Sequence, residues 1–404
     1  MRRWIILSLC GAGALSCGLH DLSGDGQTAV GGNVWEGLVG GQGSAGEPHD
    51  VCYMTVVDYK KGYDWHSDEA SESVKCSLVV YADGVPVMKV PVGPEYETSA
   101  DPDMHRLIDG SLYTDYSTET ETVIKKNGAL LFRYTGRESV CGMEVIDDDV
   151  YTLGQNRDGD GFAFRKNGEP IISRNSGYVI GRMQNDSDTL SFSFCEQIIA
   201  AEGEMERYYN VINGRVTRVE VSEDIGMVWD IISHKGRVMC LASLIGNMSP
   251  VIVDGEKTYH LAMPRPGSRI ISGRLFTAGD TVVIDLLYMT SDKLRLNTVW
   301  LGKMILNTFA VGSSVSALST TDDGGVYCAV NPAGGSSHGV IYSCGEPYDM
   351  PPGYKVMGDR SISMVNGILH VGLSSTENGG PIVWKDQVLD TLEINGYISG
   401  IIPM

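Results

Sequence analysis

Short runs of alternating apolar and polar residues follow one another along the chain from about residue 50 to the C-terminus. Gly, Asn and Asp separate these runs, as they do around Val238–Ala242 and Val282–Leu286. Alternation over such short stretches, bounded by turn-forming residues, is the pattern of antiparallel strands that bury one face. The pattern therefore predicts an all-β fold made of many short strands.

Asn-Gly or Asp-Gly pairs recur at a regular spacing of 40 to 48 residues, and degenerate pairs continue the series. The pairs are Asp83-Gly84, Asn127-Gly128, Asn167-Gly168, Asn213-Gly214 and Asp254-Gly255, followed by Gly302-Lys303, Cys344-Gly345 and Asp386-Gln387. Such pairs suit the type I′ hairpin turn, which needs positive φ at both central residues. A hairpin that returns at this period is typical of the four-stranded blades of a β-propeller.

The hairpins predict one propeller of eight four-stranded blades. Seven blades is the alternative, with the first unit outside the ring, because that unit has the longest loop. The propeller begins with a hairpin, Val51–Val57 with Leu78–Tyr81, and ends with a lone strand, Tyr397–Ile402. We expect the two to complete one blade together, since such closure leaves no open sheet edge around the ring.

Two segments carry a resemblance to a known repeat. Phe164-Arg165-Lys166-Asn167-Gly168 and Val383-Trp384-Lys385-Asp386 resemble the Trp-Lys-Asn-Gly blade repeat of β-propeller proteins common among Bacteroidetes. The resemblance covers roughly residues 50–404. An aromatic residue holds the Trp position in four copies: Tyr81, Trp300, Tyr342 and Trp384. The resemblance implies the fold and leaves the function open, because propellers host unrelated activities.

The N-terminus has the pattern of a processing signal. A basic start at Arg2 and Arg3 precedes an apolar stretch, Trp4–Leu15, and small residues lead to Cys17. Residues 1–16 resemble a bacterial lipoprotein signal, which implies that Cys17 is lipidated and that this lipid is the protein's one membrane contact. Cleavage without lipidation would give a secreted protein instead. Residues 17–48 are Gly-rich and predict a tether, and residues 49–404 form the propeller.

Composition narrows the function. Lys and Arg total 31 against 51 Asp and Glu, a net charge of −20. Such a surface repels phosphate backbones and argues against nucleic acid. The chain also lacks the common catalytic and nucleotide-binding motifs. We expect an outer-membrane or otherwise envelope-anchored, non-catalytic scaffold that binds a protein or glycan. The alternatives are a glycoside hydrolase or lyase with its site in the central depression, and a structural subunit of an envelope complex.

The candidate binding surface is the loop of the first unit, from Asp58 to Val74. It lies on the face where propellers usually bind, and it brings Tyr63, Trp65 and His66 together beside charged residues. Aromatic side chains among charges are common in binding surfaces. The alternative is that the two aromatic rings pack against the propeller.

One loop resembles the opening half of a calcium-binding loop. Asn156, Asp158 and Asp160 place oxygen side chains at alternate positions, and Gly161 follows. The acidic ligand that such loops carry later is missing, so any calcium site would be weak. The alternative is a plain β-turn, and no other cofactor is expected.

Seven cysteines remain besides Cys10 and Cys17. Two pairs are candidates for disulfides across hairpins, Cys52 with Cys76 and Cys328 with Cys344. The stronger expectation is that most of the seven are small buried apolar residues.

Overall fold

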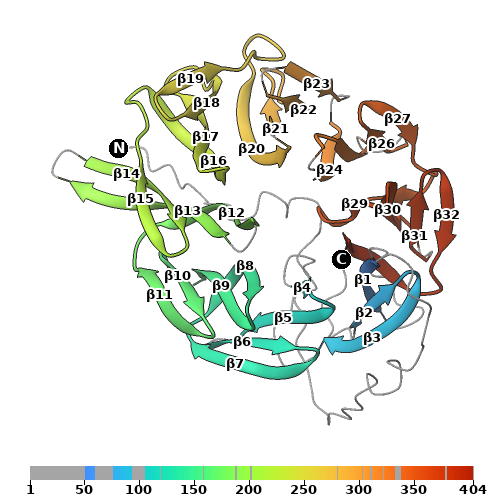
Figure 1. Cartoon of the computed structure of the whole chain (residues 1–404). Helices are drawn as coiled ribbons and strands as arrows, with labels where there is room; N and C mark the ends of the chain where they lie inside the picture. Colours follow the sequence, from blue (N-terminus) through green and yellow to red (C-terminus); the bar gives the residue numbers. More distant parts are fainter. Residues whose placement is uncertain are drawn as a thin grey trace.

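The computed structural model describes residues 51–59, 76–92, 105–118, 120–157, 159–186, 189–200, 203–279, 281–302, 304–309, 312–321, 323–332, 338–377 and 380–403. Eight antiparallel sheets stand around a common axis, so the fold is an eight-bladed β-propeller (Figure 1). The alternative of seven blades is wrong, since the first unit is a blade of the ring. The described residues include no helix long and apolar enough to cross a membrane.

Each blade runs from an inner strand at the axis to an outer strand at the rim. The inner strands, in blade order, are β33 (Gly396–Pro403), β4 (His105–Ile108), β8 (Glu138–Ile146), β12 (Tyr178–Asp186), β16 (Ile225–His234), β20 (Arg269–Ala278), β24 (Ser314–Thr320), and the divided pair β28 (Tyr354–Lys355) and β29 (Ile362–Val365). The second strands are β1 (Cys52–Tyr59), β5 (Ser111–Ser117), β9 (Asp149–Asn156), β13 (Thr189–Ala200), β17 (Arg237–Leu244), β21 (Thr281–Met289), β25 (Val326–Asn331) and β30 (Ile368–Ser375).

The two remaining strands of each blade form the hairpin that the repeat predicts. The third strands are β2 (Cys76–Ala82), β6 (Glu121–Lys126), β10 (Phe162–Lys166), β14 (Gly203–Ile212), β18 (Pro250–Asp254), β22 (Arg295–Leu301), β26 (Val340–Ser343) and β31 (Ile382–Lys385). The outer strands are β3 (Val85–Val92), β7 (Ala129–Thr135), β11 (Glu169–Arg174), β15 (Arg215–Val219), β19 (Lys257–His260), β23 (Met304–Thr308), β27 (Glu346–Asp349) and β32 (Val388–Thr391).

Blade one is completed by both ends of the propeller, as the sequence predicts. Its strand order is β3-β2-β1-β33, so the C-terminal strand is the innermost one. The pairing of β33 with β1 runs from Cys52 opposite Pro403 to Asp58 opposite Gly396. The inner edge of β1 is therefore hydrogen-bonded along its length.

Six of the eight hairpin turns have the predicted geometry in full, one is displaced, and Lys303 of the remaining turn lies outside the described residues. Positive φ at both central residues holds for Asp83-Gly84, Asn127-Gly128, Asn167-Gly168, Asn213-Gly214, Cys344-Gly345 and Asp386-Gln387. The fifth turn is displaced by one residue, because Asp254 pairs with Lys257 and leaves Gly255 and Glu256 in the centre. Gly255 has a φ of 59°, which fits the type II′ turn with Gly first.

Burial departs from the simple one-face alternation. Middle strands such as β10 and β18 are buried on consecutive residues, whereas the outer strand β15 is exposed along most of its length. A middle strand has a neighbouring blade on each side, so both of its faces enter a core. The core accordingly lies between blades, as where Phe162, Phe164 and Phe194 of blades three and four pack together.

Most inner strands contain a β-bulge. Register shifts against the second strand occur in β8, β12, β16, β20, β24 and β33. Bulges add twist and bend a strand, which suits strands that converge on an axis. In blade eight the interruption is larger, because residues 356–361 leave the sheet between β28 and β29. We call this segment the axial loop.

Neither expected disulfide forms. In the register of blade one, Cys76 lies opposite Tyr59 at the far end of β1 from Cys52. Cys328 lies opposite Tyr342, while Cys344 sits exposed in the turn, and all three of Cys52, Cys328 and Cys344 are free thiols. Cys52, Cys195, Cys240 and Cys328 are buried, which confirms the expectation of small apolar residues.

The second and third strands of blade four are unusually long. Residues Cys195–Arg207 continue β13 and β14, whose pairing extends to Ala200 opposite Gly203. The inner strand β12 pairs with β13 only as far as Cys195. The end of this hairpin therefore projects beyond its blade as a two-stranded arm.

Candidate functional site

Most of the residues predicted from sequence lie outside the described residues. This holds for Cys17, Tyr63, Trp65, His66 and Asp158. Asn156 and Asp160 belong to the connection from β9 to β10, where the Asn156 N–H donates to the Gly161 carbonyl at 2.9 Å. Within the described part of the chain, no group of three or more His, Cys, Asp or Glu side chains could hold a metal ion. The calcium loop stays a prediction.

The axis of the ring is crossed by an ion pair. Arg182 lies in the bulge of β12 in blade four, and Asp359 lies in the axial loop of blade eight. These blades stand on opposite sides of the ring (Figure 1). The Asp359 side chain is 8% exposed and that of Arg182 is 42% exposed. The axial loop thus spans the central opening to reach the facing blade.

Three arginines hold Asp359 in its charged form. Burial alone would raise the pKa of this carboxyl, but Arg182, Arg360 and Arg274 outweigh burial and lower the pKa to about 2. The axial loop is also hydrogen-bonded to β33, the C-terminal strand that closes the ring and is called the closing strand below. The Ile401 N–H donates to the Arg360 carbonyl at 2.9 Å, and the Ser361 hydroxyl donates to the Ile398 carbonyl at 3.0 Å.

A second buried ion pair lies within blade six and is linked by hydrogen bonds to blade seven. Arg274 of β20 donates to one carboxylate oxygen of Asp285 in β21, from Nε at 3.0 Å and from the terminal nitrogen at 2.7 Å. The Asn297 amide donates to the other oxygen at 2.7 Å. The carbonyl oxygen of Asn297 in turn accepts the Val315 N–H at 3.2 Å. This chain of bonds positions β24, the inner strand of the next blade.

Asp230 joins blades five and six through backbone donors. Its two carboxylate oxygens accept the N–H of Ile231 at 2.8 Å and of Leu275 at 2.7 Å. The backbone of Gly181 packs against the same carboxylate. A Cβ on this residue would lie 2.1 Å from a carboxylate oxygen of Asp230, so only glycine fits here. Burial raises the pKa of Asp230 to about 6, against the lowering effect of these two N–H groups.

A buried histidine joins blades one and two. His105 Nε2 lies 3.1 Å from the Thr55 hydroxyl and 3.0 Å from the Ser399 hydroxyl. Ser399 also donates to the Thr55 carbonyl at 3.0 Å. Burial lowers the pKa of His105 to about 3, and Arg106 and Arg360 add to the effect. His105 is therefore a neutral imidazole. Its two contacts hold blade two against blade one, where the ring closes.

These contacts limit the chemistry of the three carboxyl groups Asp359, Asp285 and Asp230. A paired acid and base would need one carboxyl group that is poised to exchange a proton with a substrate. Asp359 and Asp285 are instead ion-paired, and Asp230 is enclosed by backbone. The arrangement fits a structural centre that holds opposite and adjacent blades together.

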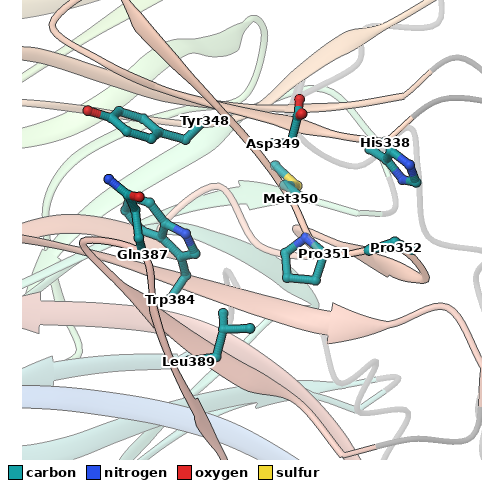
Figure 2. A pocket seen from close by; sticks show the side chains of 9 residues that line it. All are labelled: His338, Tyr348, Asp349, Met350, Pro351, Pro352, Trp384, Gln387 and Leu389. Carbon is teal, nitrogen blue, oxygen red and sulfur yellow. The ribbon is translucent and has the colours of Figure 1, made fainter.

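An open groove lies at the rim, between blades seven and eight, with a volume of about 400 Å³. Its apolar lining consists of Tyr348, Met350, Pro351, Pro352, Trp384 and Leu389. His338, Asp349 and Gln387 add polar groups. Figure 2 shows Trp384 and Leu389 on one side and Met350 and Pro351 on the other. The rings of Tyr348 and Trp384 lie 5.8 Å apart between their centroids, inclined at 54°.

Two other seams, those before blades two and three, are closed at the same place. The glycine of a hairpin turn packs against the outer strand of the preceding blade, so that a Cβ at Gly128 would lie 3.1 Å from Val90. A Cβ at Gly168 would likewise lie 3.1 Å from Phe132. In blade eight the residue at this turn position is Gln387, which lines the groove. We call this groove the seam groove.

Sequence reasoning missed both of these sites. The axial pair depends on a bulge and a loop that no periodicity marks. For the seam groove, the signal was Gln387 at a turn position that holds glycine in most of the repeats.

The ring of eight sheets defines a β-propeller. Comparison with known proteins goes no further than this fold. No protein-family model matches the chain, and no curated protein matches it. Solved structures of similar shape include the dihydro-heme d1 dehydrogenase NirN in complex with DHE, at 11% identity and a TM-score of 0.49, covering 86% of this chain and 74% of that one.

Two further structures show the same likeness. BamB from Moraxella catarrhalis is 10% identical with a TM-score of 0.42, covering 84% of this chain and 91% of that one. The β-propeller domain of the trilobed protease from Pyrococcus furiosus is 11% identical with a TM-score of 0.43, covering 85% and 95%. Such distant similarity concerns the fold and carries no function to this chain.

Proposed function

We propose that this protein is a non-catalytic binding scaffold of the cell envelope whose partner is a protein or a glycan. The observation that carries the proposal is the state of the axial carboxylates. Asp359 and Asp230 join blades and Asp285 is ion-paired within blade six, so the central depression offers none of the three to a substrate. What stays open among the described residues is surface at the rim, where we place binding without chemistry.

Turnover separates this proposal from the alternative of a carbohydrate-active enzyme. Pure protein is incubated with a panel of bacterial and host glycans, and the products are separated by chromatography. We expect no change in any glycan, while pull-down from the protein's own membranes recovers a specific partner. Cleavage of any glycan would overturn the scaffold proposal. A partner recovered in fixed stoichiometry as part of a large assembly would favour the structural-subunit alternative.

We propose that the anchor is a lipid on Cys17, on the basis of the signal-like residues 1–16. Replacing Cys17→Ser is expected to release the protein from the membrane fraction. Retention of this variant in membranes would argue against lipidation at that position.

We propose that Tyr63, Trp65 and His66 form part of the binding surface. Replacing Tyr63→Ala and Trp65→Ala together is expected to abolish partner binding at little cost in melting temperature, as exposed recognition residues do. A large fall in melting temperature with binding intact would show that the rings pack against the propeller.

We propose that Asn156, Asp158 and Asp160 bind calcium weakly. Two carboxylates without a later acidic ligand place the affinity in the millimolar range of extracellular modules. Calcium titrated into metal-free protein should release heat and raise the melting temperature, and Asp160→Asn should abolish both effects. No heat and no rise at millimolar calcium would leave only a turn.

A further inference from the structure

The seam groove lies at a turn that departs from the repeat. Where a turn glycine packs against the preceding blade, the seam is filled, as at Gly128 and Gly168. Gln387 brings a long side chain to that place, and Pro351 and Pro352 lie on the other side of the opening. A volume of about 400 Å³ falls within the range of sites that accept a ligand or the side chains of a peptide.

The neighbouring strand edge is closed to strand addition. The Met350 N–H donates to the Gly339 carbonyl at 2.8 Å, and bonded pairs alternate along an antiparallel ladder. Pro347 and Asp349 therefore hold the positions of β27 whose backbone points outward. Proline has no N–H to donate, so an arriving strand would find a gap in the edge. A partner must enter the groove with its side chains.

On the side of blade seven, the charged residues beside the groove are acidic. The hairpin of β26 and β27 contains Glu346 and Asp349 and no Lys or Arg. On the side of blade eight, Lys385 is neutralised by Asp390 at 2.6 Å. An apolar opening with acidic residues beside it is complementary to an apolar side chain with a cation next to it.

We propose that the seam groove is the docking site for a segment of a partner protein that carries apolar side chains next to Lys or Arg. The apolar side chains occupy the space between Trp384, Leu389 and Pro351, and the cation lies beside Asp349. This inference rests on the proposed function as a binding scaffold, and it names the place and the chemistry of the partner.

Labelled peptides test the proposal directly. Three are needed: one with leucines and lysines, one with the lysines replaced by glutamates, and one with the leucines replaced by serines. Binding to the full-length protein is measured by fluorescence polarisation. The leucine–lysine peptide is expected to bind at least about tenfold more tightly than either of the others, because each loses one half of the recognition.

Matched variants locate the binding. Leu389→Arg places a cation and bulk in the groove, and Leu389 is 48% exposed, so the change should cost little stability. Val216→Arg is the control, since Val216 is 37% exposed and holds the same place after the turn of blade four. We expect Leu389→Arg to weaken binding of the leucine–lysine peptide by about tenfold, and Val216→Arg to weaken it by no more than about twofold.

Equal binding of the lysine and glutamate peptides would overturn the proposal, as would equal effects of the two arginine variants. The proposed function is tested separately by pull-down with the same variants. A membrane partner that Leu389→Arg retains, together with no peptide binding, would refute the groove and leave the scaffold standing. Absence of any partner for the unmodified protein would refute the scaffold itself.

Discussion

His105 and Asp230 are almost fully removed from water, and they respond to pH in opposite directions. The pKa of His105 falls from 6.5 to about 3 on folding, so its contribution to stability is complete above 6.5 and is lost as pH falls. The pKa of Asp230 rises from 3.8 to about 6, so its contribution is complete below 3.8 and is lost as pH rises. Each contribution is worth up to several kcal/mol at ~1.4 kcal/mol per pKa unit.

The two effects should largely cancel between pH 4 and 6, which predicts a shallow stability profile for the unmodified protein there. His105→Gln removes the histidine's effect, so the free energy of unfolding of that variant should fall by about 2 kcal/mol from pH 4 to 6. The free energy of unfolding of the Asp230→Asn variant should instead rise over the same pH range, because only the effect of His105 remains. Urea unfolding at several pH values measures the slopes. Parallel profiles for the three proteins would contradict this account.

The turn residues of the repeat have a second role besides positive φ. The side-chain oxygen of Asn127 accepts the Leu112 N–H at 2.8 Å, and that of Asn167 accepts the Val150 N–H at 2.8 Å. Each bond ties the hairpin to the second strand of its blade. Cys344 occupies the same turn position with a φ of 47° and keeps the backbone bond to the Val326 carbonyl, at 3.0 Å.

Restoring the repeat at this position should stabilise the protein. In Cys344→Asn, the new amide is expected to accept the Val326 N–H and to adopt positive φ more readily than cysteine. A gain of about 1 kcal/mol in the free energy of unfolding is expected from one such bond. Asn167→Ala, the matched loss, should cost a similar amount. A neutral or destabilising Cys344→Asn, measured by thermal and urea unfolding, would contradict the role of the side chain.

At the scale of the elements, the axial loop is an enlarged form of the bulge that other inner strands carry. Its contribution can be measured by a double-mutant cycle with Arg182→Ala and Asp359→Ala. Because Asp359 is buried and Arg182 is partly exposed, we expect a coupling energy of about 1–2 kcal/mol. The rim pair Arg237–Asp254, with the arginine side chain 63% exposed, is the control and should couple by less than about 0.5 kcal/mol. Equal coupling in the two pairs would show that the axis is no better shielded than the rim.

The repeated hairpins could be predicted from sequence because their cause is local. Asn213-Gly214 fixes a turn wherever it occurs, and so the blade count and the order of strands follow from spacing. The displaced turn at Gly255 shows the limit, since a neighbouring residue can take over the central position. The axial pair was beyond such reasoning, because Arg182 and Asp359 meet only after eight blades have closed. The seam groove likewise arises between blades, where no single repeat is informative.

At the scale of the whole molecule, the ring is open only at its outer strands. Prolines Pro86, Pro170 and Pro347 lie in three of these strands, where they remove donors from the exposed edges. The inner edges have no such protection and depend on the axis. There, Asp230, Asn297 and Ser399 each bond to a neighbouring blade.

The closing strand should therefore decide whether the ring is stable. Removal of residues 397–404 leaves the inner edge of β1 unpaired and removes the Ser399 partner of buried His105. An opened ring also exposes Val56 and Val57, which are fully buried in the closed form. We expect the truncated protein to lose cooperative unfolding and to associate, as seen by circular dichroism and size-exclusion chromatography. A synthetic peptide of residues 395–404 added in excess should restore part of the melting transition, because it can occupy the vacant edge of β1. Removal of Met404 alone is the control and should have no effect. If the truncated protein melts like the full chain, the ring does not depend on its closing strand.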